Sequence, residues 1–290
     1  MRFWIVREIR LVDKFIRDYY IALSWYLREA GHTVEVTTLE SVPSDPGIYL
    51  FFHSGLPCPE AVPSNQLWVL MNLEQLTRPE YLVHTVNILT KYPKMLYADY
   101  STANLEIIRS HTWRTGLWLP YFFNPEYLRP SGVVFRDINR FFFGGLSYSP
   151  NRQSKLKPFN AYCREDTFGD ERDSLIRRSK VVLNVHYAPE YGVFESLRVY
   201  HAIYLGTPVY SLDTSLPETC FLGKDAQKYL LETPDCPSDL PELTFEYEMA
   251  SARSMIGEFT EILRSSLSIA EDPSLHVLPV DQILPAGASC

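Results

Sequence analysis

Residues 180–212, KVVLNVHYAPEYGVFESLRVYHAIYLGTPVYSL, decide the fold of this chain. The apolar run at 180–185 predicts a buried strand, and apolar residues at helical spacing predict a helix over 194–205. A glycine ends this helix, and a proline opens a second strand over 208–212. A strand, a helix and a strand in this order are typical of a βαβ unit with parallel strands.

The loop that leads into this helix carries a candidate phosphate site. A helix N-terminus presents unpaired N–H groups and a partial positive charge, and Gly192 lets the backbone come close to a ligand. Glu195 and Arg198 are three residues apart, so they share one face of the first turn. Glu195 would accept hydrogen bonds from sugar or ribose hydroxyls, and Arg198 would hold phosphate oxygens in a bidentate fork. The alternative is an ordinary i,i+3 ion pair at the helix N-terminus.

The same alternation of strands and helices extends in both directions from this unit. A turn-rich segment at 123–132 interrupts it, which predicts two domains, at 1–128 and 129–290. We therefore predict an α/β protein with two Rossmann-like, doubly wound parallel sheets that face each other across a cleft. Further strands are predicted at 2–6, 33–37, 48–52, 67–71, 94–97, 116–120, 139–143 and 158–162, and further helices at 12–30, 79–91, 102–110 and 248–268, with an extended tail after 271.

Composition excludes several classes of protein. The 290 residues hold 27 Lys and Arg against 35 Asp and Glu, and this net charge of −8 argues against a nucleic-acid partner. No apolar run reaches the ~18 residues of a transmembrane segment, and charges near the N-terminus argue against a signal peptide. The five cysteines lie far apart, so we expect neither a disulfide framework nor a zinc site, and we expect a cytoplasmic protein.

Polar residues follow five of the predicted strands. In open parallel sheets, ligands bind at the carboxyl ends of the strands, so this accumulation predicts a binding cleft. Each residue taken alone also fits a turn or a helix cap, as Asp99 does ahead of the helix at 102–110. The residues are His53 after 48–52, Asn72 and Glu74 after 67–71, Asp99 and Tyr100 after 94–97, Gly144, Gly145, Asn151 and Arg152 after 139–143, and Asn184, His186 and Tyr187 at the end of 180–185.

Taken together, these segments resemble the GT-B-fold glycosyltransferases, above all a bacterial and viral subgroup of retaining-type enzymes that use nucleotide sugars. In the second half, the resemblance rests on FG at 168–169, ERD at 171–173, SKVVLNVHY at 179–187, FESLR at 194–198 and GTPV at 206–209. In the first half, it rests on NLEQL at 72–76 and on DYS at 99–101 with Asn104.

The resemblance implies that the second domain binds the nucleotide-diphosphate sugar and the first binds the acceptor, a glycan or glycoprotein. It implies catalytic roles for Glu195, Arg198, His53 and Glu74, and acceptor contacts from Asn72, Glu74, Asp99 and Tyr100. It also implies that no metal or cofactor is needed beyond the co-substrate, such as a UDP-sugar. The implied donor-binding residues are Gly144, Gly145, Arg152, Lys155, Tyr162, Arg164, Asn184, His186, Tyr187, Tyr191, Gly192, Val193, Phe194, Glu195 and Arg198.

Several alternatives stay open. Stereochemical retention needs no separate base, whereas inversion needs one, and His53 and Glu74 are then the candidates. The family commonly has a second glutamate where this chain has His201, so a non-catalytic binding module is a rival interpretation. A different Rossmann-type enzyme, such as an oxidoreductase or methyltransferase, is disfavoured because no glycine-rich turn follows the strand at 2–6. A purely structural scaffold fits poorly with so many polar strand ends.

Overall fold

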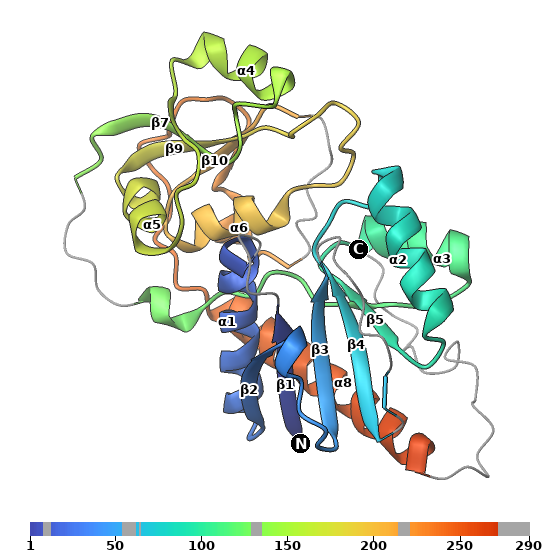
Figure 1. Ribbon diagram of the computed structural model, residues 1–290. Helices are drawn as coiled ribbons and strands as arrows, with labels where there is room; N and C mark the ends of the chain where they lie inside the picture. The colour runs from blue at the N-terminus through green and yellow to red at the C-terminus, as the bar shows by residue number, and fades with distance from the viewer. Residues whose placement is uncertain (8–12, 54–61, 64, 129–134, 214–220, 272–290) are drawn as a thin grey trace. The chain divides into compact units, whose positions relative to one another are not determined.

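The chain folds into two compact α/β units. The computed structural model describes residues 1–7, 13–53, 62–63, 65–128, 135–213 and 221–271 (Figure 1). The first unit comprises Met1–Pro120 and Ser251–Cys290, and the second comprises Tyr121–Ala250. The boundary therefore falls at Pro120, ahead of the predicted 128, and most of the C-terminal helix belongs with the first unit, whereas the sequence assigned it to the second.

A parallel sheet with the strand order β2-β1-β3-β4-β5-β6 forms the centre of the first unit. Its strands are β1 (Arg2–Arg7), β2 (Thr33–Thr38), β3 (Gly47–His53), β4 (Gln66–Asn72), β5 (Leu96–Asp99) and β6 (Leu117–Trp118), and its helices are α1 (Asp13–Glu29), α2 (Pro79–Lys91) and α3 (Thr102–Thr112), with a short 3-10 turn η1 (Leu39–Ser41). The last helix of the described residues, α8 (Glu246–Glu271), joins this unit from Ser251 onward.

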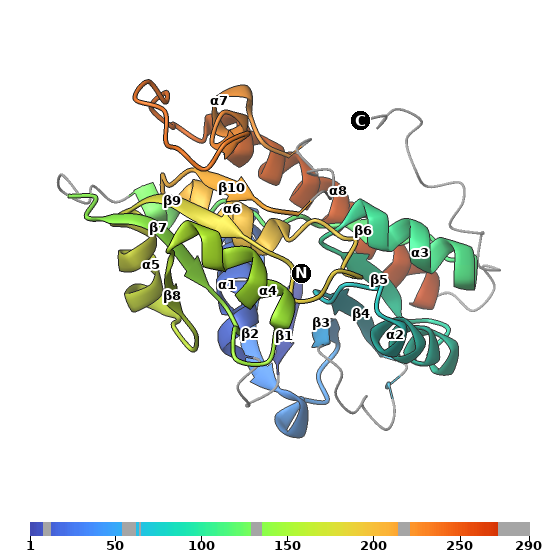
Figure 2. The same ribbon diagram turned by 90° about the horizontal axis from the view of Figure 1, so that it is seen from above.

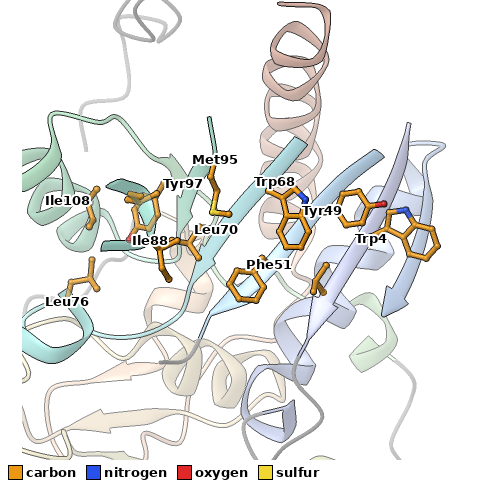
Figure 3. Close-up of a cluster of buried hydrophobic side chains, with 12 residues drawn as sticks. Trp4, Tyr49, Phe51, Trp68, Leu70, Leu76, Ile88, Met95, Tyr97 and Ile108 are labelled. Carbon is orange, nitrogen blue, oxygen red and sulfur yellow. The ribbon is translucent and has the colours of Figure 1, made fainter. Parts of the chain in front are cut away.

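Aromatic side chains fill one face of this sheet (Figure 3). Tyr49 stacks between Trp4 and Trp68, with ring centroids 6.2 and 5.2 Å apart, and α2 and α3 cover this face with Ile88 and Ile108 among others. Because successive strand residues point to opposite faces, Phe52 lies on the other side, where Tyr19 and Tyr20 of α1 contact it. Both faces are covered, as a parallel sheet requires.

The second unit has a parallel sheet with the order β11-β10-β9-β7-β8. In Figure 1, α4 lies on one face of this sheet and α5 and α6 on the other, and Figure 2 looks onto the α4 side. Its elements are β7 (Ile138–Phe143), β8 (Tyr162–Arg164), β9 (Ser179–Asn184), β10 (Val209–Ser211), β11 (Leu230–Leu231), α4 (Pro150–Leu156), α5 (Gly169–Arg177), α6 (Ser196–Tyr204) and α7 (Lys224–Gln227), with 3-10 turns η2 (Pro125–Leu128) and η3 (Lys157–Phe159).

The two sheets share one topology. In each, the first strand of the unit lies between the second and the third, so the chain leaves the first and third strands toward opposite sides. Ligands of open α/β sheets bind at such a switch point, outside the carboxyl ends of the two strands. In the second unit this point lies at the ends of β7 and β9, which are paired neighbours.

Two predicted strands differ from the structure. The strand predicted at 94–97 lies at Leu96–Asp99, and the strand predicted at 158–162 is a 3-10 turn followed by β8. The helices α4 and α5 were not predicted. None of the helices within the described residues is both long enough and apolar enough to cross a membrane.

Candidate functional site

The switch point of the second unit gathers residues from two strand ends and two helices. Gly144 directly follows β7, Asn184 ends β9, and Glu195 is the N-cap residue of α6. Arg152 comes from α4 and Arg198 from the first turn of α6. The predicted donor-site residues around the ends of β7 and β9 therefore come together in the structure.

The centre of this cluster is a carboxylate shared by two arginines. Glu195 forms ion pairs with Arg152, at 3.4 Å, and with Arg198. The three side chains are only 6%, 12% and 14% exposed for Arg152, Glu195 and Arg198, so their charges are held largely out of water. We call these three residues the arginine pair and its bridging glutamate.

Aromatic rings and carbonyl groups fix the two guanidiniums in place. Both lie 5.3 Å from the centre of the Phe142 ring, and Arg198 also lies 5.8 Å from that of Phe143. Arg152 donates to the carbonyl groups of Gly145 and Val185, at 2.9 and 3.0 Å, and Arg198 donates to that of Val185 at 3.2 Å. Such anchoring fixes the direction in which the remaining N–H groups point.

The cluster carries a net positive charge. Two guanidiniums face one carboxylate, and the pKa of Arg152 falls to about 10, first through burial and then through the nearby Arg198 charge. Arg152 therefore remains protonated at neutral pH. The first turn of α6 adds positive potential, and no side chain caps it, because the Glu195 carboxylate is bound to the arginines instead. This arrangement suits an anionic ligand.

Other predicted donor residues support the cluster. The Asn184 side-chain oxygen accepts a hydrogen bond from Arg198 at 3.2 Å, and the Tyr187 ring lies 5.3 Å from the Arg152 guanidinium. Lys155 is bound to Asp213 at 2.6 Å, and the same aspartate accepts from the backbone N–H of His186. Lys155 and Asp213 thus neutralise each other, and the positive charge of the site rests on the arginine pair.

The remaining donor predictions have mixed outcomes. Val193 and Phe194 are buried, whereas Gly192 is exposed. Tyr191 lies with its ring 6.0 Å from that of Tyr187. The two residues at the ends of β8, Tyr162 and Arg164, are exposed, and Arg164 forms an ion pair with Glu171 at 3.1 Å.

In the first unit, the predicted acceptor residues form an interior network. Asn72 and Asp99 are each 1% exposed and lie opposite each other on β4 and β5, where Asn72 donates to Asp99 at 2.7 Å. Tyr100 is buried as well. This burial favours a supporting role for these side chains over direct contact with a ligand. The backbone of His53 ends β3, and its side chain lies outside the described part of the structure.

His201 has a structural explanation that sequence reasoning missed. It is 3% exposed, and its ring nitrogens lie 2.8 Å from Asp173 and 2.8 Å from the hydroxyl of Tyr121, the first residue of the second unit. Asp173 also binds Arg172, and burial raises its pKa while bonds from His201 and Arg172 lower it to a net value of about 2. His201 therefore anchors the entry of the chain into the second unit and does not take the place of a ligand-binding glutamate.

Within the described residues, no group of three or more His, Cys, Asp or Glu side chains is close enough to hold a metal ion.

Sequence comparisons relate this chain to viral proteins. No protein-family model matches the chain. Uncharacterized protein L140 of Acanthamoeba polyphaga mimivirus is 25% identical over 238 residues, which cover 78% of this chain and 73% of L140. Uncharacterized protein R358 of the same virus is 28% identical over 142 residues, about half of each chain.

Solved structures give the fold a name. AviGT4, a glycosyltransferase involved in avilamycin A biosynthesis, aligns with a TM-score of 0.58 and 13% identity over 92% of this chain and 98% of its own. T4 phage BGT, in complex with UDP and Mn2+, aligns with a TM-score of 0.50 and 12% identity over 94% of each chain. With its two parallel sheets, the chain therefore has the GT-B fold of these glycosyltransferases.

Proposed function

We propose that this protein is a glycosyltransferase that moves a sugar from a nucleotide-diphosphate donor to a hydroxyl group of a glycan or glycoprotein. The observation that carries the proposal is the largely buried arginine pair with its single bridging glutamate, at the sheet switch point and beside an uncapped helix. A diphosphate would neutralise the excess positive charge of this cluster. UDP is the first nucleotide to test, because the T4 phage BGT structure contains it.

In this proposal, the second unit binds the donor. The bond from the anomeric carbon to the diphosphate oxygen breaks, and its electron pair leaves with the diphosphate. Arg152, Arg198 and the N–H groups of α6 stabilise that developing negative charge, which is the main catalytic task in such a reaction. Glu195 holds the two guanidiniums, and in this proposal it would also accept from a sugar hydroxyl. The charge of the arginine pair supplies the stabilisation that a metal gives elsewhere, so we expect transfer without a metal.

The first unit would bind the acceptor. Glu74 follows β4, and burial raises the pKa of its carboxyl to about 7, an effect that Arg78 partly offsets. A group with a pKa near 7 is well suited to take a proton from a hydroxyl at neutral pH. Between the two candidate bases, Glu74 is thus the one whose described surroundings favour the role.

A panel of nucleotides and nucleotide sugars tests donor binding. We expect one nucleoside diphosphate family to raise the melting temperature selectively, since a ligand at 100 times its Kd stabilises a protein by about 2.7 kcal/mol. Transfer or slow hydrolysis of the radiolabelled matching donor, measured with EDTA and with added Mn2+, then tests turnover and the metal. A flat thermal response would refute the proposal, and tight binding without any turnover would favour the non-catalytic module.

Gly144 allows a test of the same site by substitution. Its φ is +130°, and a Cβ there would lie 3.0 Å from the Arg198 guanidinium and 3.5 Å from that of Arg152, whereas a Cβ on Gly145 would meet nothing within 4 Å. Gly144→Ala should therefore displace the arginine pair and weaken nucleoside-diphosphate binding by about tenfold or more, since small displacements of charged groups have such effects. Gly257→Ala in α8, where an added Cβ also meets nothing within 4 Å, is the control and should bind like the wild type in calorimetry. Equal affinities for the two variants would place the diphosphate elsewhere.

A further inference from the structure

Asp99 is a buried carboxyl on which four hydrogen-bond donors converge. Asn72 donates to it at 2.7 Å, Asn104 at 3.0 Å and the backbone N–H of Ser101 at 2.9 Å, and the Tyr97 hydroxyl is the fourth donor. Burying a carboxyl costs free energy unless its oxygens are bonded, and here both oxygens are. The donors come from β4, β5, the turn after β5 and α3, so Asp99 joins four segments at the carboxyl edge of the sheet.

Two of these donors also hold the backbone of Glu74. The side-chain amides of Asn72 and Asn104 donate to the carbonyl of Glu74 at 2.9 and 2.8 Å. The Asn72 side-chain oxygen accepts from the Glu74 N–H at 3.3 Å, and the Asn104 oxygen accepts from the Leu76 N–H at 3.0 Å. The loop that carries Glu74 is thus fixed on both sides by amides that are themselves fixed by Asp99.

The Glu74 carboxyl stands apart from this network. Among the described residues, its oxygens accept no hydrogen bond, and Arg78 is the cation that acts on it. The network therefore holds the backbone of the residue and, within the described part of the chain, adds no hydrogen bond to its carboxyl. If the network only tied down a loop, amide-to-carbonyl bonds would suffice, and a buried carboxyl at its centre would be an unnecessary cost.

We infer that Asp99, Asn72 and Asn104 form a positioning network that aims Glu74 at the acceptor hydroxyl. This inference rests on the proposed function. In the step it serves, Glu74 takes the hydroxyl proton, and the hydroxyl oxygen bonds to the anomeric carbon. As that bond forms, the carbon–diphosphate bond breaks with its electron pair on the diphosphate, so the sugar is transferred with inversion. Asp99 touches neither substrate and acts through the two asparagines.

A double-mutant cycle on kcat tests this network. At saturating donor and acceptor, Glu74→Gln should lower kcat by about 100-fold or more, the usual contribution of a general base. Asn104→Ala should lower kcat about tenfold and leave the donor KM unchanged, because a misaimed catalytic group costs roughly that much or more. The double variant should be no slower than Glu74→Gln alone, since Asn104 acts only through Glu74. Asn65→Ala, which removes an exposed amide of the same unit, is the control and should match the wild type.

Some outcomes would overturn this inference, and another would refute the proposed function. Multiplicative losses in the double variant, a wild-type kcat for Glu74→Gln, or a product of retained anomeric configuration by NMR would each overturn the inference. If Asn104→Ala does not fold, Asp99→Asn replaces it in the same cycle, because it keeps the shape of the side chain. A wild-type protein that transfers no sugar would instead refute the proposed function.

Discussion

Arg198→Ala is expected to lower kcat/KM for sugar transfer by about 100- to 1,000-fold, the usual cost of losing one group that stabilises a developing negative charge. The loss should exceed that of an ordinary ion pair because the Arg198 side chain is only 14% exposed and its charge is poorly screened by water. The variant also leaves Glu195 with Arg152 alone, which removes the excess positive charge of the cluster. Steady-state kinetics with the donor identified by the nucleotide panel measures the effect.

Two further variants separate charge from geometry. Arg198→Lys keeps the charge but lacks the planar fork, so it should recover only part of the lost activity. Arg178→Ala removes an exposed arginine of the same unit that pairs with Asp137, and it should leave kcat/KM unchanged. Comparable losses in Arg178→Ala and Arg198→Ala would show that the effect is one of general stability or charge and would contradict the assigned site. Arg152 is a poorer probe, since its removal also takes the guanidinium donor away from the carbonyl group of Gly145.

Asp99→Ala should cause the largest loss of stability among the variants considered. It removes the acceptor of four buried donors, and unsatisfied buried donors cost roughly 1–3 kcal/mol each, so we expect a loss of about 2–4 kcal/mol after local rearrangement. Urea denaturation followed by tryptophan fluorescence reports on the first unit, because all five tryptophans lie within residues 1–120. Asp45→Ala removes an exposed carboxylate that pairs with Arg2 and should change stability by less than about 0.5 kcal/mol. Equal effects would contradict the central role of Asp99.

The same carboxyl gives stability a defined pH dependence. Burial raises the pKa of Asp99 from 3.8 to about 7, although its four donors oppose the shift. The folded protein therefore holds a proton that the unfolded chain has lost between about pH 4 and pH 7, and this contribution to stability declines as the pH rises through that range. Asp99→Asn cannot ionise there, so the stability of the wild type relative to this variant should fall from pH 4 to pH 7. If the free energy of unfolding of the wild type instead rose relative to that of Asp99→Asn over this range, the four donors would outweigh burial.

Strong periodic signals made most of the fold predictable. The helix over 79–91 was predicted at its observed bounds, and the strands before it were placed within one residue of theirs. The strand predicted at 94–97 ended too early, because Asp99 was expected to follow the strand and not to belong to it. Asp99 is the last residue of β5 because Asn72 pairs with it across the sheet, and no local pattern reveals that partner. The short α4 did carry a signal, since Ser149 caps it and Pro150 opens it.

The candidate site was only partly predictable, because sequence shows which polar residues follow a strand but not which groups they contact. The rule of strand ends named the residues around Gly144 and Asn184, which the structure brings together. It also named Asn72 and Asp99, because a polar residue after a strand looks the same in sequence whether it faces a ligand or a partner inside the protein. Only the three-dimensional pairing distinguishes the two cases, as it does for His201, whose partners lie 28 and 80 positions away.

The anchoring of Tyr121 by His201 has a consequence for exchanging parts of this chain with its viral relatives. Tyr121 and His201 would have to come from the same parent, and so would Tyr204, whose hydroxyl binds the Tyr121 carbonyl at 3.0 Å. Chimeras should therefore be joined at Pro120 and Ala250. A crossover near residue 128 would take Tyr121 from one parent and the residue at position 201 from the other, so the hydrogen bond between Tyr121 and His201 could be lost.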